Sequence, residues 1–175
     1  MRTETKQVKI YSFADVLADE NLKQKVLERQ YDINVDHDWW DSIYYDAEQI
    51  GCKISGFDIG RESYCDLSFD LSAHEIAQNI INNHGEQCDT YKTAASFLEE
   101  WQPIYNTYLD ESSEHYESSE YEDKLLDIEQ EFCRALSEDY LYTLRREYEY
   151  LTSEEAILET LEANEYEFTD DGRDY

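Results

Sequence analysis

The feature that most constrains the fold is a run of apolar residues in the C-terminal half that recurs at steps of three and four. Its members are Leu125, Ile128, Phe132, Leu136, Tyr140, Leu144, Tyr148 and Leu151. Because an α-helix has about 3.6 residues per turn, side chains at this spacing share one face. The run therefore predicts a single long helix whose apolar face packs against the rest of the chain.

A β-hairpin is predicted over residues 52–69. Residues 52–59 alternate apolar and polar side chains, residues 60–62 are typical of a turn, and residues 63–69 can return as the second strand. Residues 9–11 can pair as a further short strand. With helices on both sides of the hairpin, the predicted fold class is α+β, mostly helical, with a small antiparallel sheet.

Capping signals and apolar spacing predict five further helices. The first is an amphipathic run over 13–27 that can break near Asp19, and the second is capped by Asp36 or Asp38 and ended by Gly51. The third follows the capping box of Ser72 and Glu75. The fourth covers 91–108, with Pro103 as a kink or restart, and the fifth is capped within residues 152–155.

Charge is distributed unevenly along the 175 residues. The chain has 43 acidic and 14 basic side chains, for a formal net charge of −29. Residues 1–87 hold 17 acidic and 8 basic side chains, whereas residues 88–175 hold 26 and 6. We therefore expect an α+β module over 1–109, an exposed and mobile acidic connection over 110–123, and an acidic helical region over 124–175 that packs on the module.

Net charge and patterning exclude several classes of function. A chain at −29 repels nucleic acid and anionic lipid, so direct binding to either is not expected. No apolar run reaches the length of a membrane span, and no apolar signal segment follows Met1, so the expected location is the cytoplasm. No nucleotide-binding, hydrolase or zinc motif occurs, so no catalytic residue, metal or cofactor is predicted.

One local pattern resembles the start of a calcium-binding loop, because Asp32, Asn34 and Asp36 supply oxygens at alternate positions. His37 stands where such a loop needs glycine, and Ile43 stands where it needs a bidentate glutamate. Helix capping is the simpler explanation of these acids. A metal-dependent or hydrolytic enzyme that uses these residues with Asp38 stays an alternative.

The four cysteines show no metal-binding or catalytic pattern. Cys52, Cys65, Cys88 and Cys133 form no CxxC pair, and we expect them to be reduced and mostly buried. A strongly negative field raises the pKa of a thiol, which opposes a nucleophilic role.

The acidic half predicts a surface that resembles DNA. Carboxylates three or four residues apart on a helix lie about 5–6 Å apart at Cβ, similar to phosphates along one strand. B-DNA carries one charge per about 1.7 Å, so 29 charges correspond to about 50 Å of duplex. The predicted partner-binding residues are the acids Glu114, Glu117, Glu120, Asp123, Asp127, Glu131, Glu138 and Asp139 and the exposed tyrosines Tyr116, Tyr121, Tyr142 and Tyr150. A solvated acidic face that confers only solubility is the alternative.

Several segments resemble a family of small phage and prophage proteins. They are residues 11–13, 33–41 (INVDHDWWD), 51–61 (GCKISGFDIGR), 83–85, 90–94 and 162–172. By composition the chain is also similar to phage DNA-mimic inhibitors of restriction and CRISPR nucleases. The resemblance implies action in the host cytoplasm on a bacterial defence protein with a basic nucleic-acid-binding surface.

Two questions stay open at this point. The chain can instead be a protein-binding module, or an antitoxin-like partner, that acts through an aromatic N-terminal surface around Trp39 and Trp40, with the acidic half only solubilising. The sequence also leaves open whether the chain forms a homodimer.

Overall fold

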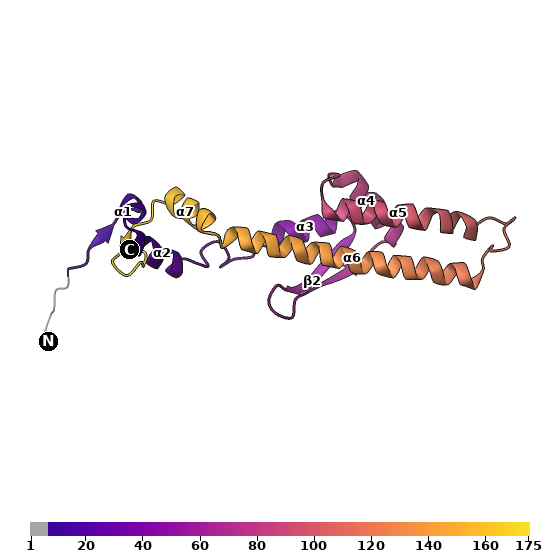
Figure 1. Cartoon of the computed structure of the whole chain (residues 1–175), viewed down its shortest axis with the longest axis horizontal. Helices are drawn as coiled ribbons and strands as arrows, with labels where there is room; N and C mark the ends of the chain where they lie inside the picture. The colour runs from indigo at the N-terminus through magenta and orange to yellow at the C-terminus, as the bar shows by residue number, and fades with distance from the viewer. Residues whose placement is uncertain (1–6) are drawn as a thin grey trace. The chain divides into compact units, whose positions relative to one another are not determined.

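The computed structural model describes residues 7–175, and within that range the chain forms seven helices and four strands (Figure 1). The helices are α1 (Phe13–Ala18), α2 (Glu20–Arg29), α3 (Asp41–Gln49), α4 (Ala73–Asn83), α5 (Asp89–Tyr108), α6 (Ser119–Leu151) and α7 (Glu154–Ala163). The strands are β1 (Ile10–Tyr11), β2 (Cys52–Asp58), β3 (Tyr64–Phe69) and β4 (Phe168–Thr169). β1 pairs with β4 and β2 with β3, both antiparallel, so the predicted fold class is confirmed.

The chain divides into two compact units at places that the charge pattern does not indicate. The first unit combines Met1–Trp39 with Arg146–Tyr175, and the second is Trp40–Arg145. The long helix predicted from the apolar run is confirmed as α6, and its residues belong to both units. The boundaries expected at 109 and 123 fall inside the second unit, and α6 begins at Ser119, within the expected connection.

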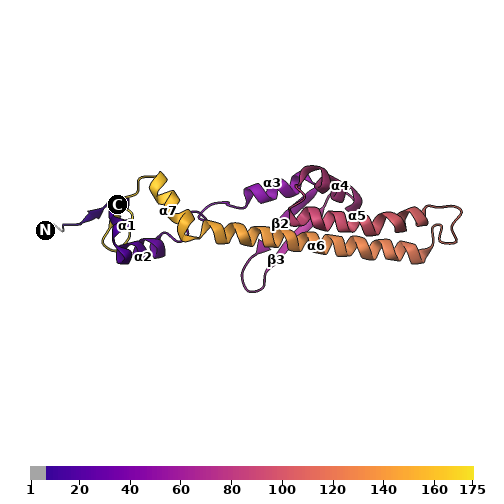
Figure 2. The same cartoon turned by 45° about the horizontal axis from the view of Figure 1, so that its top comes forward.

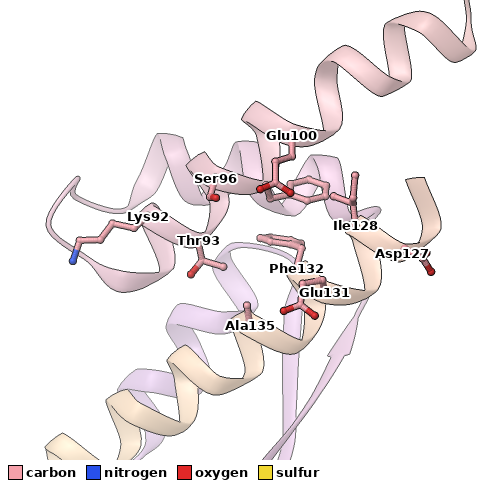
Figure 3. Close-up of a pocket in the computed structure, with 10 residues that line it drawn as sticks. Lys92, Thr93, Ser96, Glu100, Asp127, Ile128, Glu131, Phe132 and Ala135 are labelled. Carbon is pink, nitrogen blue, oxygen red and sulfur yellow. The ribbon is translucent and has the colours of Figure 1, made fainter. Parts of the chain in front are cut away.

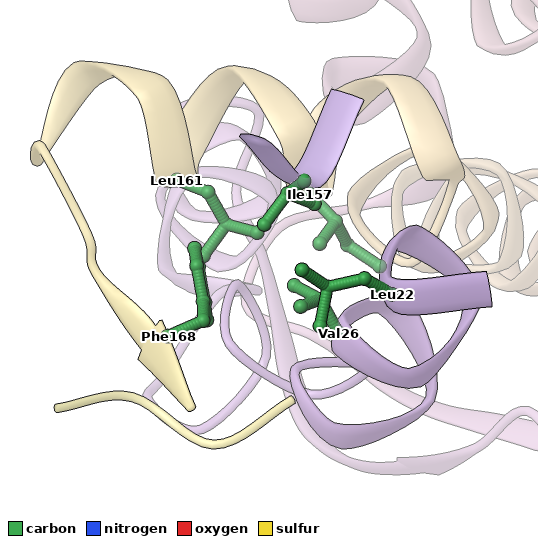
Figure 4. Packing of buried hydrophobic residues seen from close by; sticks show 6 residues of the cluster. Leu22, Val26, Ile157, Leu161 and Phe168 are labelled. Carbon is green, nitrogen blue, oxygen red and sulfur yellow. The ribbon is translucent and has the colours of Figure 1, made fainter. Parts of the chain in front are cut away.

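The first unit is held together by apolar residues from both ends of the chain (Figure 4). The buried members are Val16, Leu22, Val26, Ile157, Leu161 and Phe168. The predicted break near Asp19 is confirmed, because Asp19 ends α1 and its carboxylate accepts hydrogen bonds from the N–H groups of Asn21 and Leu22. The predicted strand near residue 10 is also confirmed, and its Tyr11 lies opposite Phe168 of β4.

The segment after α7 lies directly on the main chain of α2. Lys25 Nζ donates to the carbonyl of Asp170 (2.9 Å), and Arg29 Nε donates to that of Asp171 (3.3 Å). Gly172 has φ of +81°, and a Cβ at this position would lie 2.7 Å from the carbonyl carbon and oxygen of Lys25. Glycine alone has both the conformational freedom and the small size that this contact requires.

In the second unit, the hairpin predicted over 52–69 is confirmed. Its register pairs Cys52 with Phe69, and a bulge interrupts the ladder between Ile54 and Gly56. Cys52 and Ile54 are buried, and α3 packs against β2 on that side. The hairpin therefore contributes its alternating apolar side chains to the core, as the period of two requires.

Local capping signals are confirmed at several helix ends. Ser72 and Glu75 form the predicted capping box, in which the Ser72 N–H donates to Glu75 Oε2 (3.1 Å). Gly51 follows α3 with φ of +91°, as expected for a helix-ending glycine. α5 continues through Pro103, so the helix does not restart there.

The predicted start of α3 is wrong. Asp36 and Asp38 lie in the irregular turns before the helix, and the N-cap residue is Trp40, whose side chain makes no capping hydrogen bond. These turns are positioned by a distant contact, because Asn34 binds the end of α6 and the middle of α7.

Candidate protein-binding surface

α5 and α6 lie side by side in the second unit as an antiparallel pair (Figure 2). The rings of Phe97 and Phe132 stack with centroids 4.4 Å apart, and the indole N–H of Trp101 donates to Glu129 Oε1 (2.9 Å). These contacts bury the apolar stripe of α6 and leave the opposite side of the helix facing solvent.

Five carboxylates occupy this solvent-facing side, which we call the acidic face of α6. They are Glu120, Asp123, Asp127, Glu131 and Glu138, and all five are exposed. Steps of three, four and seven residues keep them on one side of the helix. All five are among the partner-binding residues predicted from the sequence.

Two cations interrupt the acidic face of α6. Lys124 Nζ lies 2.7 Å from a carboxylate oxygen of Glu120. Arg134 forms an ion pair with Glu131 and a second with Glu138, the latter at 3.4 Å. The acidic face of α6 is therefore less negative than its carboxylates alone suggest. Sequence spacing had shown the acids without showing which of them are paired.

Charge density on this face can be compared with that of DNA. From Glu120 to Glu138 the helix rises about 27 Å, at about 1.5 Å per residue. One strand of B-DNA would carry about eight phosphates over that length, at about 3.4 Å per charge. Five carboxylates and two cations fall short of that density, so a DNA-like surface needs further acids nearby.

The loop between α5 and α6 supplies those acids. We call Asp110, Glu111, Glu114 and Glu117 the acidic tip, and all four are exposed. The Glu117 N–H donates to the carbonyl of Tyr108 (3.0 Å), and His115 stacks on Tyr121 of α6 with centroids 4.4 Å apart. The loop is thereby fastened to both helices, and the acidic tip continues directly into the acidic face of α6.

Asp139 does not belong to this surface, contrary to prediction. Thr93 Oγ1 of α5 donates to Asp139 Oδ2 (2.7 Å), and the residue is only partly accessible. Burial raises the pKa of this carboxyl above its ordinary value. Asp139 therefore contributes to the α5–α6 contact.

The four predicted tyrosines have different surroundings. Tyr116, Tyr142 and Tyr150 are exposed, whereas Tyr121 is half-buried beneath His115 and Lys124. Tyr150 belongs to the first unit and the others to the second. The structure therefore brings Tyr116 together with the acidic tip, and Tyr142 follows Glu138 along α6.

Sequence reasoning missed a groove between α5 and α6 (Figure 3). It encloses about 570 Å³ and is lined by Lys92, Thr93, Ser96, Phe97, Glu100, Asp127, Ile128, Glu131, Phe132 and Ala135. Ser96, Glu100 and Ala135 lie at the margins of the apolar stripes, which periodicity can show. Which of them face one another depends on the helix register, which periodicity does not show.

Four side chains from different elements form a polar network inside the second unit. The Tyr140 hydroxyl donates to Asp46 Oδ2 (2.9 Å), and Asp46 Oδ1 lies 3.4 Å from His84 Nε2. His84 Nδ1 lies 2.7 Å from Thr90 Oγ1. An Asp–His–Thr series resembles a nucleophilic triad, but Thr90 is buried and none of these residues lines the groove. The network joins α3, α6, the end of α4 and the first turn of α5.

This network predicts a pH effect on stability. The hydrogen bonds from His84 and Tyr140 hold the pKa of Asp46 below its ordinary value. Its stabilising contribution is therefore complete above the unfolded-state pKa and is lost as the pH falls through the lower folded-state pKa. We expect Asp46→Asn to be less stable than the wild type at neutral pH, with the difference shrinking below about pH 4. Urea unfolding at several pH values measures this, with Asp66→Asn as the exposed control. A difference that does not change with pH would contradict it.

Asn34, the central residue of the calcium-loop pattern, has structural partners within the chain. Asn34 Nδ2 donates to the carbonyl of Leu151 (3.0 Å), and Thr160 Oγ1 donates to Asn34 Oδ1 (2.7 Å). Across residues 7–175, no group of three or more His, Cys, Asp or Glu side chains is arranged to hold a metal ion.

The four cysteines are free, but only Cys52 is fully buried and Cys88 is exposed. The pKa of Cys52 is raised to about 12 and that of Cys65 to about 11. The main cause is burial, whereas the sequence had suggested the negative field. Both thiols are therefore protonated near neutral pH.

The described helices include none with the length and apolar character needed to cross a bilayer. Comparison of the chain with protein-family models, with curated proteins and with solved structures found no match. The resemblance to small phage and prophage proteins thus stays a prediction.

Proposed function

We propose that this chain is a non-enzymatic, phage-encoded inhibitor of a bacterial defence system. The acidic tip and the acidic face of α6 would occupy the basic nucleic-acid-binding surface of a nuclease, helicase or DNA-binding subunit. The supporting observation is that the α5–α6 pair joins these two sets of carboxylates into one exposed surface while burying its apolar stripe.

Electrostatics and aromatic contacts have separate roles in this proposal. A dense negative surface accelerates association with a basic partner but discriminates poorly between basic proteins. Tyrosine buries a large area and offers a hydroxyl group at low entropic cost. Tyr116 at the tip and Tyr142 on α6 are exposed and would supply selectivity.

The aromatic alternative has weaker support. The rings of Trp40 and Phe57 pack with centroids 5.5 Å apart, and those of Trp39 and Tyr148 lie 5.7 Å apart. Both tryptophans are therefore half-buried in contacts within the chain. An aromatic docking surface would expose more of them.

The test compares two variants with the same net charge. One neutralises the surface, with Glu114→Gln, Glu117→Gln, Asp123→Asn and Asp127→Asn. The matched control neutralises four exposed acids of the first unit, with Glu149→Gln, Glu159→Gln, Glu162→Gln and Glu167→Gln. We expect the first variant to lose at least about tenfold in partner affinity and the control about twofold or less.

The partner for this measurement comes from a pull-down out of bacterial lysate. Parallel washes at about 0.1 M and about 1 M salt shorten the Debye length from about 10 Å to about 3 Å. A partner released by salt and by duplex DNA, and weakened only by the surface variant, supports the proposal. Equal weakening by both variants, or a partner that resists salt and DNA, would overturn it.

A further inference from the structure

The groove between α5 and α6 is lined by apolar side chains, with Glu100 of α5 on one side of Phe132 and Glu131 of α6 on the other (Figure 3). The floor consists of the Phe97 and Phe132 rings, flanked by Ile128 and Ala135. The rings are only 4% and 3% exposed. The groove therefore exposes only the edges of the stacked Phe97 and Phe132 rings. A ligand would lie along the groove without displacing these rings.

The antiparallel register produces this arrangement. Thr93 contacts Asp139 and Phe97 contacts Phe132, so positions on α5 and α6 pair in opposite chain directions. The small residues Ser96 and Ala135 consequently lie across from each other and leave space between the helices. One turn further along, Glu100 of α5 and Glu131 of α6 lie on opposite sides of the Phe132 ring (Figure 3).

The charges around the groove are unequal at its two ends. At one end Lys92 is paired with Asp89 at 2.8 Å, and Asp139 accepts a hydrogen bond from Thr93. Glu100, Asp127 and Glu131 line the other end, and of these three only Glu131 is paired with Arg134. A second copy of this chain, at −29, would place further acids against these three. A neutral apolar molecule would place no positive charge opposite Glu100 and Asp127.

We propose that this groove binds a basic amphipathic helix of the partner protein. Apolar side chains of that helix would pack against Ile128 and the exposed edges of Phe97 and Phe132, while flanking Lys or Arg side chains would pair with Glu100 and Glu131. An amphipathic helix in an apolar groove is a common mode of recognition, with anchors three or four residues apart. The inference rests on the proposed function and names the element of the partner that the acidic surface recognises.

Two labelled peptides test the proposal directly. One is a helix-forming peptide of about 18 residues, made of Lys, Arg and Leu, with its leucines on one face. The other has the same composition in an order that scatters the leucines around the helix. We expect wild-type protein to bind the first peptide at least about tenfold more tightly in fluorescence anisotropy, because only this peptide has its leucines on one face. Composition and charge are identical in the two peptides, so they cannot cause the difference.

Groove-filling variants provide the decisive comparison. Ser96→Trp fills the groove without changing charge, and Gln102→Trp adds the same ring to an exposed position of α5 outside it. We expect Ser96→Trp to abolish the preference between peptides and Gln102→Trp to keep it. Circular dichroism establishes that both variants are folded.

Three outcomes would overturn the inference. Equal affinity of the wild type for both peptides would mean that charge alone acts. A preference that survives in Ser96→Trp would place binding elsewhere, and a wild-type dimer that Ser96→Trp dissociates would make a second copy the occupant.

Failure of this inference is distinct from failure of the proposed function, because the surface variant would still lose its partner. Conversely, a surface variant that keeps its partner overturns the function even where the peptide preference holds.

Discussion

Replacing Gly172 with alanine is expected to destabilise the first unit by at least about 2 kcal/mol. Alanine at φ of +81° enters the left-handed region, which costs an L-residue about 1–2 kcal/mol. Its Cβ would also lie 2.7 Å from the main chain of Lys25 and 2.9 Å from the nitrogen of Val26. Because these are backbone atoms of α2, the C-terminal segment itself must move away.

Hydrogen exchange measured by mass spectrometry tests this prediction region by region. Peptides from α2, α7 and the C-terminal segment should exchange faster in Gly172→Ala, while those from α4 and α5 should be unchanged. Gly85→Ala is the control, because no atom lies within 4 Å of its Cβ position. Unchanged protection of α2 in Gly172→Ala would contradict the contact.

Leu136→Ala is expected to lower the free energy of unfolding by about 2–5 kcal/mol, the usual range for a buried leucine. Leu136 lies on the apolar stripe of α6 and is 0% exposed. Leu126→Ala is the matched control, since Leu126 is on the same helix but 52% exposed. Its expected effect is about 0.5 kcal/mol or less, because no cavity forms.

Urea unfolding followed by circular dichroism and by tryptophan fluorescence measures both variants. The second unit contains the buried Trp101 and the half-buried Trp40, so tryptophan fluorescence reports on the unfolding of this unit. Similar losses in the two variants would mean that the stripe of α6 is not packed as described.

Elements with strong local signals were predictable from the sequence. The apolar period of 3.6 residues identified α6, and the period of two identified the 52–69 hairpin. Ser72 with Glu75 and Gly51 marked helix ends correctly, because a cap is decided by residues within one turn. The start of α3 was missed because its N-cap residue, Trp40, makes no side-chain capping hydrogen bond, so the residue type gives no sign of where the helix begins.

The candidate surface was only partly predictable. Spacing on one helix shows which acids share a face, and it found the acidic face of α6. It does not show that Thr93 would draw Asp139 into the α5 contact, or that His115 would cover Tyr121. The division of the chain likewise follows contacts between its two ends, whereas the charge pattern suggested a boundary in the acidic loop.

The sequence by itself therefore determined the helices, the hairpin, the net charge and the face of α6 on which the acids lie. These depend on periodicity and capping, which act over a few residues. Only the tertiary structure decided the antiparallel register of α5 and α6, and with it the groove between Glu100 and Glu131 and the continuity of the acidic tip with the acidic face of α6. Register is set by packing between side chains far apart in sequence, such as Phe97 with Phe132, and no local pattern encodes it.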